Sequence, residues 1–261
     1  LDDVHVTFKT RTGSILHPNK VKAVQGVTMK LMPGETIGIV GESGCGKSTT
    51  ANVICGLQAP TSGKVYFKGV DVTKRSAQQR RTIGRVISVV FQDPATALNA
   101  RMTVHDQLID PLNVHKIGTA QEREDRALQL IEMVGLPKSV LDALPGQLSG
   151  GQRQRVAIAR ALSLKPDAIV ADEPTSALDV SVRAQILNLL TDLKKDLGLS
   201  MVFISHDIQT VRYISDRIMV MNGGKCVESG PAQDVFNNPQ DAYTRKLLGA
   251  APSLLHPDLG K

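Results

Sequence analysis

The segment at residues 41–48, GESGCGKS, constrains the fold of this chain more than any other feature. An apolar run at residues 36–40 precedes it, and a helix-forming stretch that Gly56 would end follows it. A glycine-rich turn between a strand and a helix directs successive backbone N–H groups into one concavity, at the positive end of the helix dipole. Such a concavity binds anions, so the segment predicts a phosphate-binding loop in an α/β fold.

Two side chains of this loop point to a nucleoside triphosphate and its metal ion. Lys47 adds a positive charge where the β- and γ-phosphates would lie, and Ser48 adds a hydroxyl for Mg²⁺. The alternative, a flexible turn with a solvated lysine, is disfavoured by the strand before the loop and the helix after it. We expect the nucleotide to contact Gly41, Ser43, Gly44, Cys45, Gly46, Lys47, Ser48 and Thr49.

Acidic residues end a second apolar run, at residues 168–171. Ligands of open α/β sheets bind at the carboxyl ends of the strands. We expect Asp172 to hold Mg²⁺ and Glu173 to polarise the attacking water as a general base. Taken alone, the pair fits a helix N-terminal cap equally well. A phosphate loop on a presumed neighbouring strand favours the catalytic interpretation.

Polar residues follow two further apolar runs. His206 comes after residues 201–204, and Gln92 comes after residues 89–91. We expect His206 to contact the γ-phosphate and Gln92 to reach Mg²⁺ and the water. A lone histidine is more often structural, and Gln92 by itself is weak evidence. Their placement at strand tips supports the functional interpretation.

A second helix start suited to anions lies at residues 148–152, LSGGQ. Ser149 offers a hydroxyl, and the two glycines after it offer backbone N–H groups. A plain helix cap explains Ser149 alone. It does not explain why one chain with one set of strand-tip residues has two such helix starts.

Strand and helix patterns alternate along most of the chain. Strands are expected at residues 4–8, 27–31, 36–40, 63–67, 85–91, 168–172, 201–204 and 218–221. This alternation predicts a mostly parallel sheet covered by helices. A stretch with only helical signals, at about residues 93–162, interrupts it and predicts a separate helical subdomain. No apolar stretch approaches the ~20 residues that a membrane-spanning helix requires.

Composition excludes little. The net charge of +6 would suit a nucleic acid or an anionic membrane surface, but aromatic residues are only 3% and form no stripe with basic residues. The 3 cysteines have no metal-type spacing, which favours a reducing cytoplasm. Cys45 lies at a helix start, where the pKa of a thiol tends to fall. The favoured interpretation is still a small loop residue without a catalytic role.

From about residue 4 to residue 248 the chain resembles the ATP-binding-cassette (ABC) ATPases. Residues 41–48 match the Walker A loop, and residues 169–173 match Walker B with its catalytic glutamate. Gln92 matches the Q-loop, residues 148–152 the signature, residues 176–179 the D-loop and His206 the switch histidine. The motifs stand in the order that the family has.

The resemblance implies an ABC nucleotide-binding domain with a mostly parallel P-loop core sheet, an N-terminal antiparallel β subdomain and a helical insertion. Residues 1–92 and 163–248 would form the RecA-like core with the β subdomain, residues 93–162 the signature subdomain, and residues 249–261 a tail. It also implies a head-to-tail dimer in which the signature of one subunit caps ATP held by Lys47 of the other. The further nucleotide contacts that it implies are Phe8 (stacking on adenine), Ser149, Gly150, Gly151, Gln152 and Asp179.

The resemblance is greatest to the ATPase subunits of bacterial oligopeptide and dipeptide importers, through residues 171–182 and 238–248. It implies two transmembrane permease subunits, a second ABC ATPase subunit and, indirectly, an extracytoplasmic solute-binding protein, at the cytoplasmic face of the membrane. No nucleic acid partner is implied. Asp241 and Ala242 stand where the tail motif usually has His-Pro. Because no cysteine follows Cys226, we expect no iron–sulphur cluster.

Other assignments remain open. A soluble ABC ATPase, such as a carbon–phosphorus lyase accessory ATPase or a nucleic-acid repair or translation factor, is the main alternative. A regulatory cassette without catalysis conflicts with the presence of Lys47, Glu173 and His206. The transported solute and the identity of the second ATPase subunit do not follow from these residues.

Overall fold

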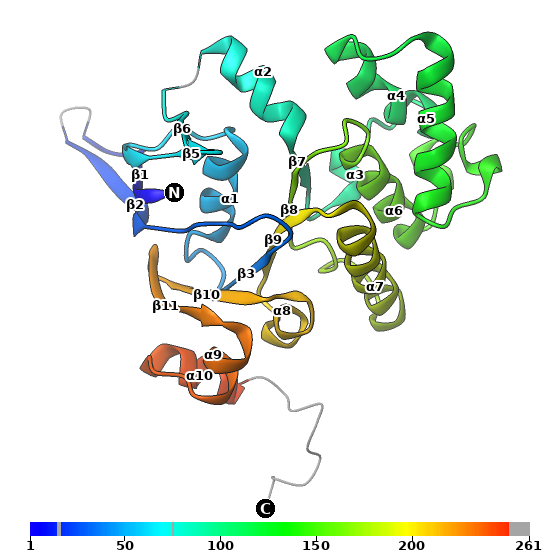
Figure 1. The fold of residues 1–261 in the computed structure, drawn as a ribbon. Helices are drawn as coiled ribbons and strands as arrows, with labels where there is room; N and C mark the ends of the chain where they lie inside the picture. Colours follow the sequence, from blue (N-terminus) through cyan, green and yellow to red (C-terminus); the bar gives the residue numbers. More distant parts are fainter. Residues whose placement is uncertain (15–16, 75, 251–261) are drawn as a thin grey trace, which may run out of the picture.

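A six-stranded sheet forms the centre of the computed structural model, which describes residues 1–14, 17–74 and 76–250 (Figure 1). Its strand order is β11-β10-β3-β9-β8-β7. The strands are β3 (Thr36–Val40), β7 (Ile87–Val90), β8 (Ala168–Asp172), β9 (Ser200–Ser205), β10 (Arg217–Asn222) and β11 (Lys225–Pro231). All neighbours pair in parallel except β11, which runs antiparallel to β10.

The apolar runs of the sequence become strands that are buried on both faces. Ala171 and Phe203 pack in a core with the helices α6 (Gly150–Ala161), α7 (Val180–Leu197) and α8 (Ile208–Ile214). Their neighbours Val170 and Val202 face the other way, toward α1 (Lys47–Cys55) and the N-terminal strands. Because a core covers each face of the sheet, successive residues of a strand are both buried. This explains why the strands appear in the sequence as continuous apolar runs.

The strand order corrects one expectation. The phosphate-loop strand β3 and the Walker B strand β8 are not neighbours, because β9, which ends next to His206, lies between them. All these strands end at one edge, where Val40 pairs with Ser205 and Asp172 pairs with Ile204. The insertion of β9 thus adds the histidine between the phosphate loop and the carboxylates.

A smaller antiparallel sheet covers the α1 side, with the order β2-β1-β4. It consists of β1 (Asp2–Ser14), β2 (His17–Val27) and β4 (Ser62–Lys64), and β5 (Tyr66–Phe67) pairs with β6 (Val70–Asp71) beside it. The strand expected at residues 27–31 is not formed: β2 ends at Val27, and Met29 exchanges two backbone hydrogen bonds with Leu1. The strand expected at residues 63–67 is split at Val65, whose N–H donates to Thr73 Oγ1 instead.

Helices occupy the stretch between β7 and β8, at the upper right of Figure 1. They are α3 (Pro94–Ala97), α4 (Val104–His115), α5 (Ala120–Met133) and α6, with two 3₁₀ turns at Lys138–Val140 and Pro145–Gln147. A capping box starts α5: Thr119 Oγ1 accepts from the N–H of Glu122, and the Glu122 side chain accepts from the N–H of Thr119. The division of the chain into subdomains stays a prediction.

The remaining helices are α2 (Ala77–Val86) and, near the C-terminus, α9 (Ala232–Asn237) and α10 (Ala242–Ala250). The first two residues of the strand expected at residues 85–91 belong to α2, so β7 begins only at Ile87. None of the helices in the described part of the chain is long and apolar enough to cross a membrane.

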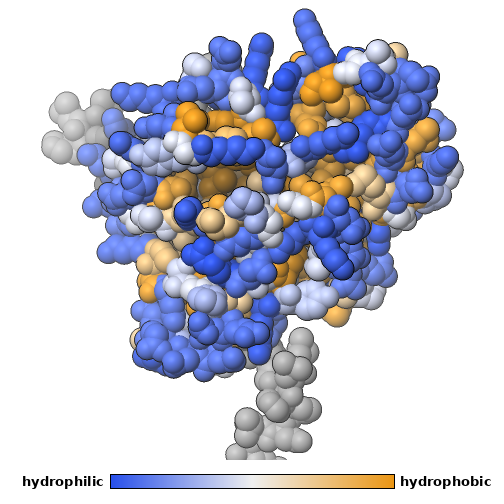
Figure 2. Space-filling view, in the orientation of Figure 1, coloured by the Kyte–Doolittle hydropathy of each residue, from blue (hydrophilic) through white to orange (hydrophobic). Residues whose placement is uncertain are grey.

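A cavity of about 1150 Å³ lies at the amino ends of the core strands, among apolar residues such as Met29, Phe67 and Val202. In the same orientation as Figure 1, apolar side chains gather around a hollow on this face (Figure 2). The cavity is at the edge of the sheet opposite to the strand tips, so it is not the predicted nucleotide site.

Candidate functional site

The phosphate loop connects β3 to α1 and is pressed against its neighbours at two glycines. Gly46 precedes the helix with φ 104°, and a Cβ there would lie 2.3 Å from the carbonyl oxygen of Ala23 in β2. A Cβ at Gly41 would lie 2.1 Å from the carbonyl oxygen of Met221 in β10. Both distances are far below van der Waals contact, so the loop takes this path only with glycine at both positions.

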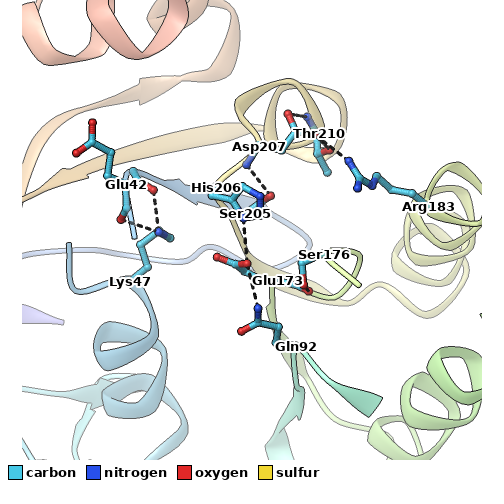
Figure 3. A network of polar contacts seen from close by, with 11 residues as sticks. Glu42, Lys47, Gln92, Glu173, Ser176, Arg183, Ser205, His206, Asp207 and Thr210 are labelled. Atoms are coloured by element: carbon cyan, nitrogen blue, oxygen red, sulfur yellow. Dashed lines mark hydrogen bonds and ion pairs between the residues drawn. The ribbon is translucent and has the colours of Figure 1, made fainter. Parts of the chain in front are cut away.

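Lys47 is held across the mouth of this loop. Its Nζ donates to the carbonyl oxygens of Gly41 at 2.7 Å and Glu42 at 3.0 Å, and only 5% of the residue is exposed (Figure 3). The ammonium group is therefore fixed beside the helix start, where the backbone N–H groups of α1 also point. This arrangement suits an anion with several oxygens.

Asp172, at the tip of β8, offers a donor set for a hard cation. Its carboxyl hydrogen-bonds with Ser48, while its Oδ1 is buried and has no hydrogen-bond partner. Burial raises the pKa of Asp172, and the charge of Glu173 raises it further, while Ser48 and Lys47 oppose the shift. A buried carboxylate oxygen without a partner is costly unless a donor or a cation reaches it. Together with the hydroxyl of Ser48, it fits Mg²⁺, which commonly binds one or two protein oxygens plus phosphate oxygens and water.

Glu173 lies at the centre of the site (Figure 3). Nδ1 of His206 lies 3.0 Å from its Oε2, so the ring N–H donates to the carboxylate, and Nε2 of Gln92 donates to the same oxygen at 3.5 Å. The three residues follow β8, β9 and β7, respectively. The sequence predicted all three as site residues, and the structure brings them together at one carboxylate.

The backbone of Glu173 is in the left-handed region, with φ 48°. For a residue with a side chain this conformation costs about 1–3 kcal/mol and persists only where the surroundings impose it. Here its N–H donates to the carbonyl oxygen of Ile204, and its own carbonyl accepts from Ser176. The turn after β8 therefore directs the carboxylate toward His206 and Gln92.

The second helix start, at α6, has a capping box of its own. Ser149 Oγ accepts from the N–H of Gln152 at 3.2 Å, and the Gln152 side chain accepts from the N–H of Ser149 at 2.9 Å. A Cβ on Gly151 would lie 2.7 Å from Cγ1 of Val182 in α7, so this glycine also permits close helix packing. In Figure 1, α6 and α1 lie on different sides of β8. Within one chain the two predicted anion sites are thus apart.

Asp179 has a structural role in this chain as the N-cap of α7. Its Oδ1 accepts from the N–H of Val182 and from the hydroxyl of Ser181, each at 2.9 Å. These bonds hold the pKa of the Asp179 carboxyl below its usual value. A contact of Asp179 with nucleotide stays a prediction.

Two expectations about Phe8 and Cys45 need correction. Phe8 is not at the end of the first strand: β1 continues to Ser14, and Phe8 pairs with Val21 in the hairpin with 41% of its surface exposed. Its stacking on adenine stays a prediction. The pKa of Cys45 is raised, not lowered, because burial of the thiol outweighs the charge of Lys47 and the backbone bonds. The Cys45 side chain is buried within the phosphate loop.

Sequence reasoning missed one contact of the phosphate loop. The N–H of Glu42 donates to the phenol oxygen of Tyr243 in α10 at 3.0 Å. Tyr243 is 201 residues away, so no local pattern predicts the contact. The only signal was that the tail stretch around Tyr243 resembles the importer ATPases.

The comparisons with known proteins agree with this geometry. A family model described as ABC transporter matches residues 24–176. The dipeptide transport ATP-binding protein DppF of Haemophilus influenzae is 46% identical over 95% of this chain and 76% of its own length. The oligopeptide transport ATP-binding protein OppF of Bacillus subtilis is 48% identical over 89% of this chain and 77% of its own length. Among solved structures, the ATP-binding cassette MJ0796, a dimer in a post-hydrolysis state bound to ADP and Pi, has a TM-score of 0.78 and 33% identity, with 88% of this chain and 97% of that chain covered.

Proposed function

The chain belongs to the ABC transporter family, and we propose that its ATPase site powers a membrane importer for dipeptides, oligopeptides or a similar small solute. The convergence of Gln92 and His206 on the Glu173 carboxylate, beside the phosphate loop, carries the ATPase assignment. The substrate class rests on likeness to relatives named for dipeptide and oligopeptide transport.

In the proposed reaction Glu173 accepts the proton of the attacking water. The bond from His206 Nδ1 holds the carboxylate in place and turns the other ring nitrogen, Nε2, away from it. When the imidazole carries both protons, Nε2 can donate to a phosphate oxygen. Gln92 restrains the same carboxylate from β7. Lys47 and the N–H groups at the start of α1 compensate the charge of the β- and γ-phosphates.

We assign Mg²⁺ to Ser48 and Asp172, with Gln92 close to the same strand tips. When bound, the metal ion neutralises the phosphate oxygens. The buried, unpartnered Oδ1 of Asp172 is the observation that supports this assignment. To bind the metal ion, Asp172 has to be ionised, although burial raises its pKa. A bound cation would favour the ionised form.

The proposed working unit is a head-to-tail pair of cassettes at the cytoplasmic face of the membrane. Ser149, Gly150, Gly151 and Gln152 of one cassette cap the nucleotide held by Lys47 of the other. The separation of α1 from α6 within the chain supports this pairing. Two permease subunits would form the channel and receive the motion from the helices after Gln92, and a solute-binding protein would deliver the solute from outside.

The test is a detergent pull-down of the tagged chain from its native membranes, with mass spectrometry of the proteins that accompany it. Lys47→Ala serves as the matched control: it is expected to keep its partners but to lose most ATP affinity. Recovery of two multi-span permeases, a second cassette and a peptide-binding protein is the expected result. Recovery of soluble partners alone would contradict the importer and leave the ATPase site intact.

A further inference from the structure

We propose that Tyr243 is a positioning residue of the phosphate loop, through which the C-terminal helix α10 sets the affinity of this chain for ATP. The inference rests on the proposed function and extends it to a residue outside the motifs of the site. Its central observation is the hydrogen bond from the N–H of Glu42, in the loop, to the phenol oxygen of Tyr243 at 3.0 Å.

The bond to Tyr243 restrains the same peptide unit that positions Lys47. The N–H of Glu42 and the carbonyl of Gly41 belong to one planar peptide group. Tyr243 accepts from the N–H at one end, and Lys47 Nζ donates to the carbonyl oxygen at the other end at 2.7 Å. A rotation of this peptide would break the first bond and move the acceptor of the second. The phenol therefore restrains the orientation of the lysine ammonium without contacting it.

Tyr243 is itself fixed by a chain of bonds that begins in the core sheet. The carboxylate of Glu228 in β11 accepts from the N–H groups of Gln240 at 2.8 Å and Asp241 at 3.1 Å. Asp241 Oδ1 in turn accepts from the N–H of Tyr243 at 2.8 Å and from that of Thr244 at 3.3 Å. The first turn of α10 is thus anchored to β11, and its tyrosine has little freedom to follow a moving loop.

Asp241 is one of the residues that depart from the usual His-Pro of the tail motif, and this network gives it a role. Its carboxylate accepts two of the free N–H groups at the start of α10. Burial raises the pKa of the Tyr243 phenol, although the bond from Glu42 opposes the shift, so the hydroxyl is neutral at physiological pH. A neutral phenol oxygen is a suitable acceptor for a backbone N–H.

The test compares Tyr243→Phe with Tyr213→Phe in the full chain. Tyr213 is a matched control because its hydroxyl also makes one hydrogen bond, to Asn188 Oδ1 at 2.8 Å, but the residue is 63% exposed and lies on α8. The probe is Mg-ATP, measured by equilibrium binding and by steady-state hydrolysis. Amide exchange of the peptide that spans residues 41–48 is followed by mass spectrometry.

For Tyr243→Phe we expect Kd and KM for ATP to rise about two- to tenfold, the effect of one neutral hydrogen bond, with kcat within about twofold of wild type. The loop peptide should exchange faster, while Tyr213→Phe matches wild type in both measurements. A role limited to general stability would not accelerate exchange in this peptide alone. Wild-type Kd and wild-type loop exchange in Tyr243→Phe would overturn the proposal.

Asp241→Ala keeps the hydroxyl but releases the first turn of α10, so it provides a second test if Tyr243→Phe does not fold. We expect it to raise Kd in the same direction, and an unchanged Kd would count against the proposal. The two hypotheses fail separately. A wild-type chain that binds ATP but does not hydrolyse it would contradict the proposed function, while its Kd still tests Tyr243.

Discussion

Replacing Gly151 by alanine should destabilise the chain through one identifiable contact. The new Cβ would lie 2.7 Å from Cγ1 of Val182, whereas carbon atoms pack at about 3.5–4.0 Å. Forcing such an overlap into packed helices costs about 1–3 kcal/mol, and the gain in helix propensity from glycine to alanine returns at most ~1 kcal/mol. We therefore expect a net loss of about 1–2 kcal/mol in the free energy of unfolding.

A double-mutant cycle isolates the contact. Val182→Ala removes Cγ1, so Gly151→Ala made in that background should cost less than about 0.5 kcal/mol. Urea unfolding followed by circular dichroism gives the four free energies. Gly150→Ala is the control, because its Cβ would meet Leu178 Cδ2 at 3.7 Å, an ordinary contact. If Gly151→Ala costs the same in both backgrounds, the glycine is not there to admit Val182.

Three further outcomes are expected. Glu173→Gln should lower kcat for ATP hydrolysis about 10²- to 10⁴-fold and leave ATP affinity unchanged; wild-type turnover would refute its role as general base. Iodoacetamide should modify Cys45 more slowly than an exposed thiol, faster as pH rises, and more slowly still with Mg-ATP, as peptide mass spectrometry can test; a rate equal to that of glutathione would contradict its burial. Burial lowers the pKa of His105, but hydrogen bonds to Glu124 and Asp106 outweigh it and raise the pKa above 6.5. The resulting stability is present below pH 6.5 and lost as pH rises through the raised pKa, so thermal melting of His105→Asn should depend less on pH in that range.

The elements that position the site could be predicted because strand formation and helix capping depend on residues that are close together in the sequence. The apolar run expected as a strand at residues 168–172 forms β8 with these bounds. The capping boxes of α5 and α6 follow from the spacing of serine or threonine and glutamate or glutamine. The strand prediction for residues 27–31 was wrong because alternation reports only which side chains are buried. A strand also needs a partner for its backbone.

The order of the strands could not be predicted this way. That β9 separates β3 from β8 is a property of the whole sheet, and the contact of His206 with Glu173 depends on it. The strained backbone of Glu173 is equally a consequence of its neighbours. The contact of Tyr243 with Glu42 depends on β11, a strand that no apolar run predicts because its residues are exposed or only partly buried.

The capping box at α6 bears on how the second anion site can act. Ser149 Oγ accepts the N–H of Gln152, and a hydroxyl that accepts one bond still has its own hydrogen to donate. The box therefore orients the serine and leaves it able to bind a phosphate oxygen. Because α6 lies away from α1, that phosphate would have to come from a nucleotide held by another cassette. Gly151 would then have two roles. It lets α6 approach Val182, and its N–H belongs to the helix start that would face the partner's nucleotide. In the proposed head-to-tail pair, packing within one chain and recognition between two chains would therefore constrain the same glycine.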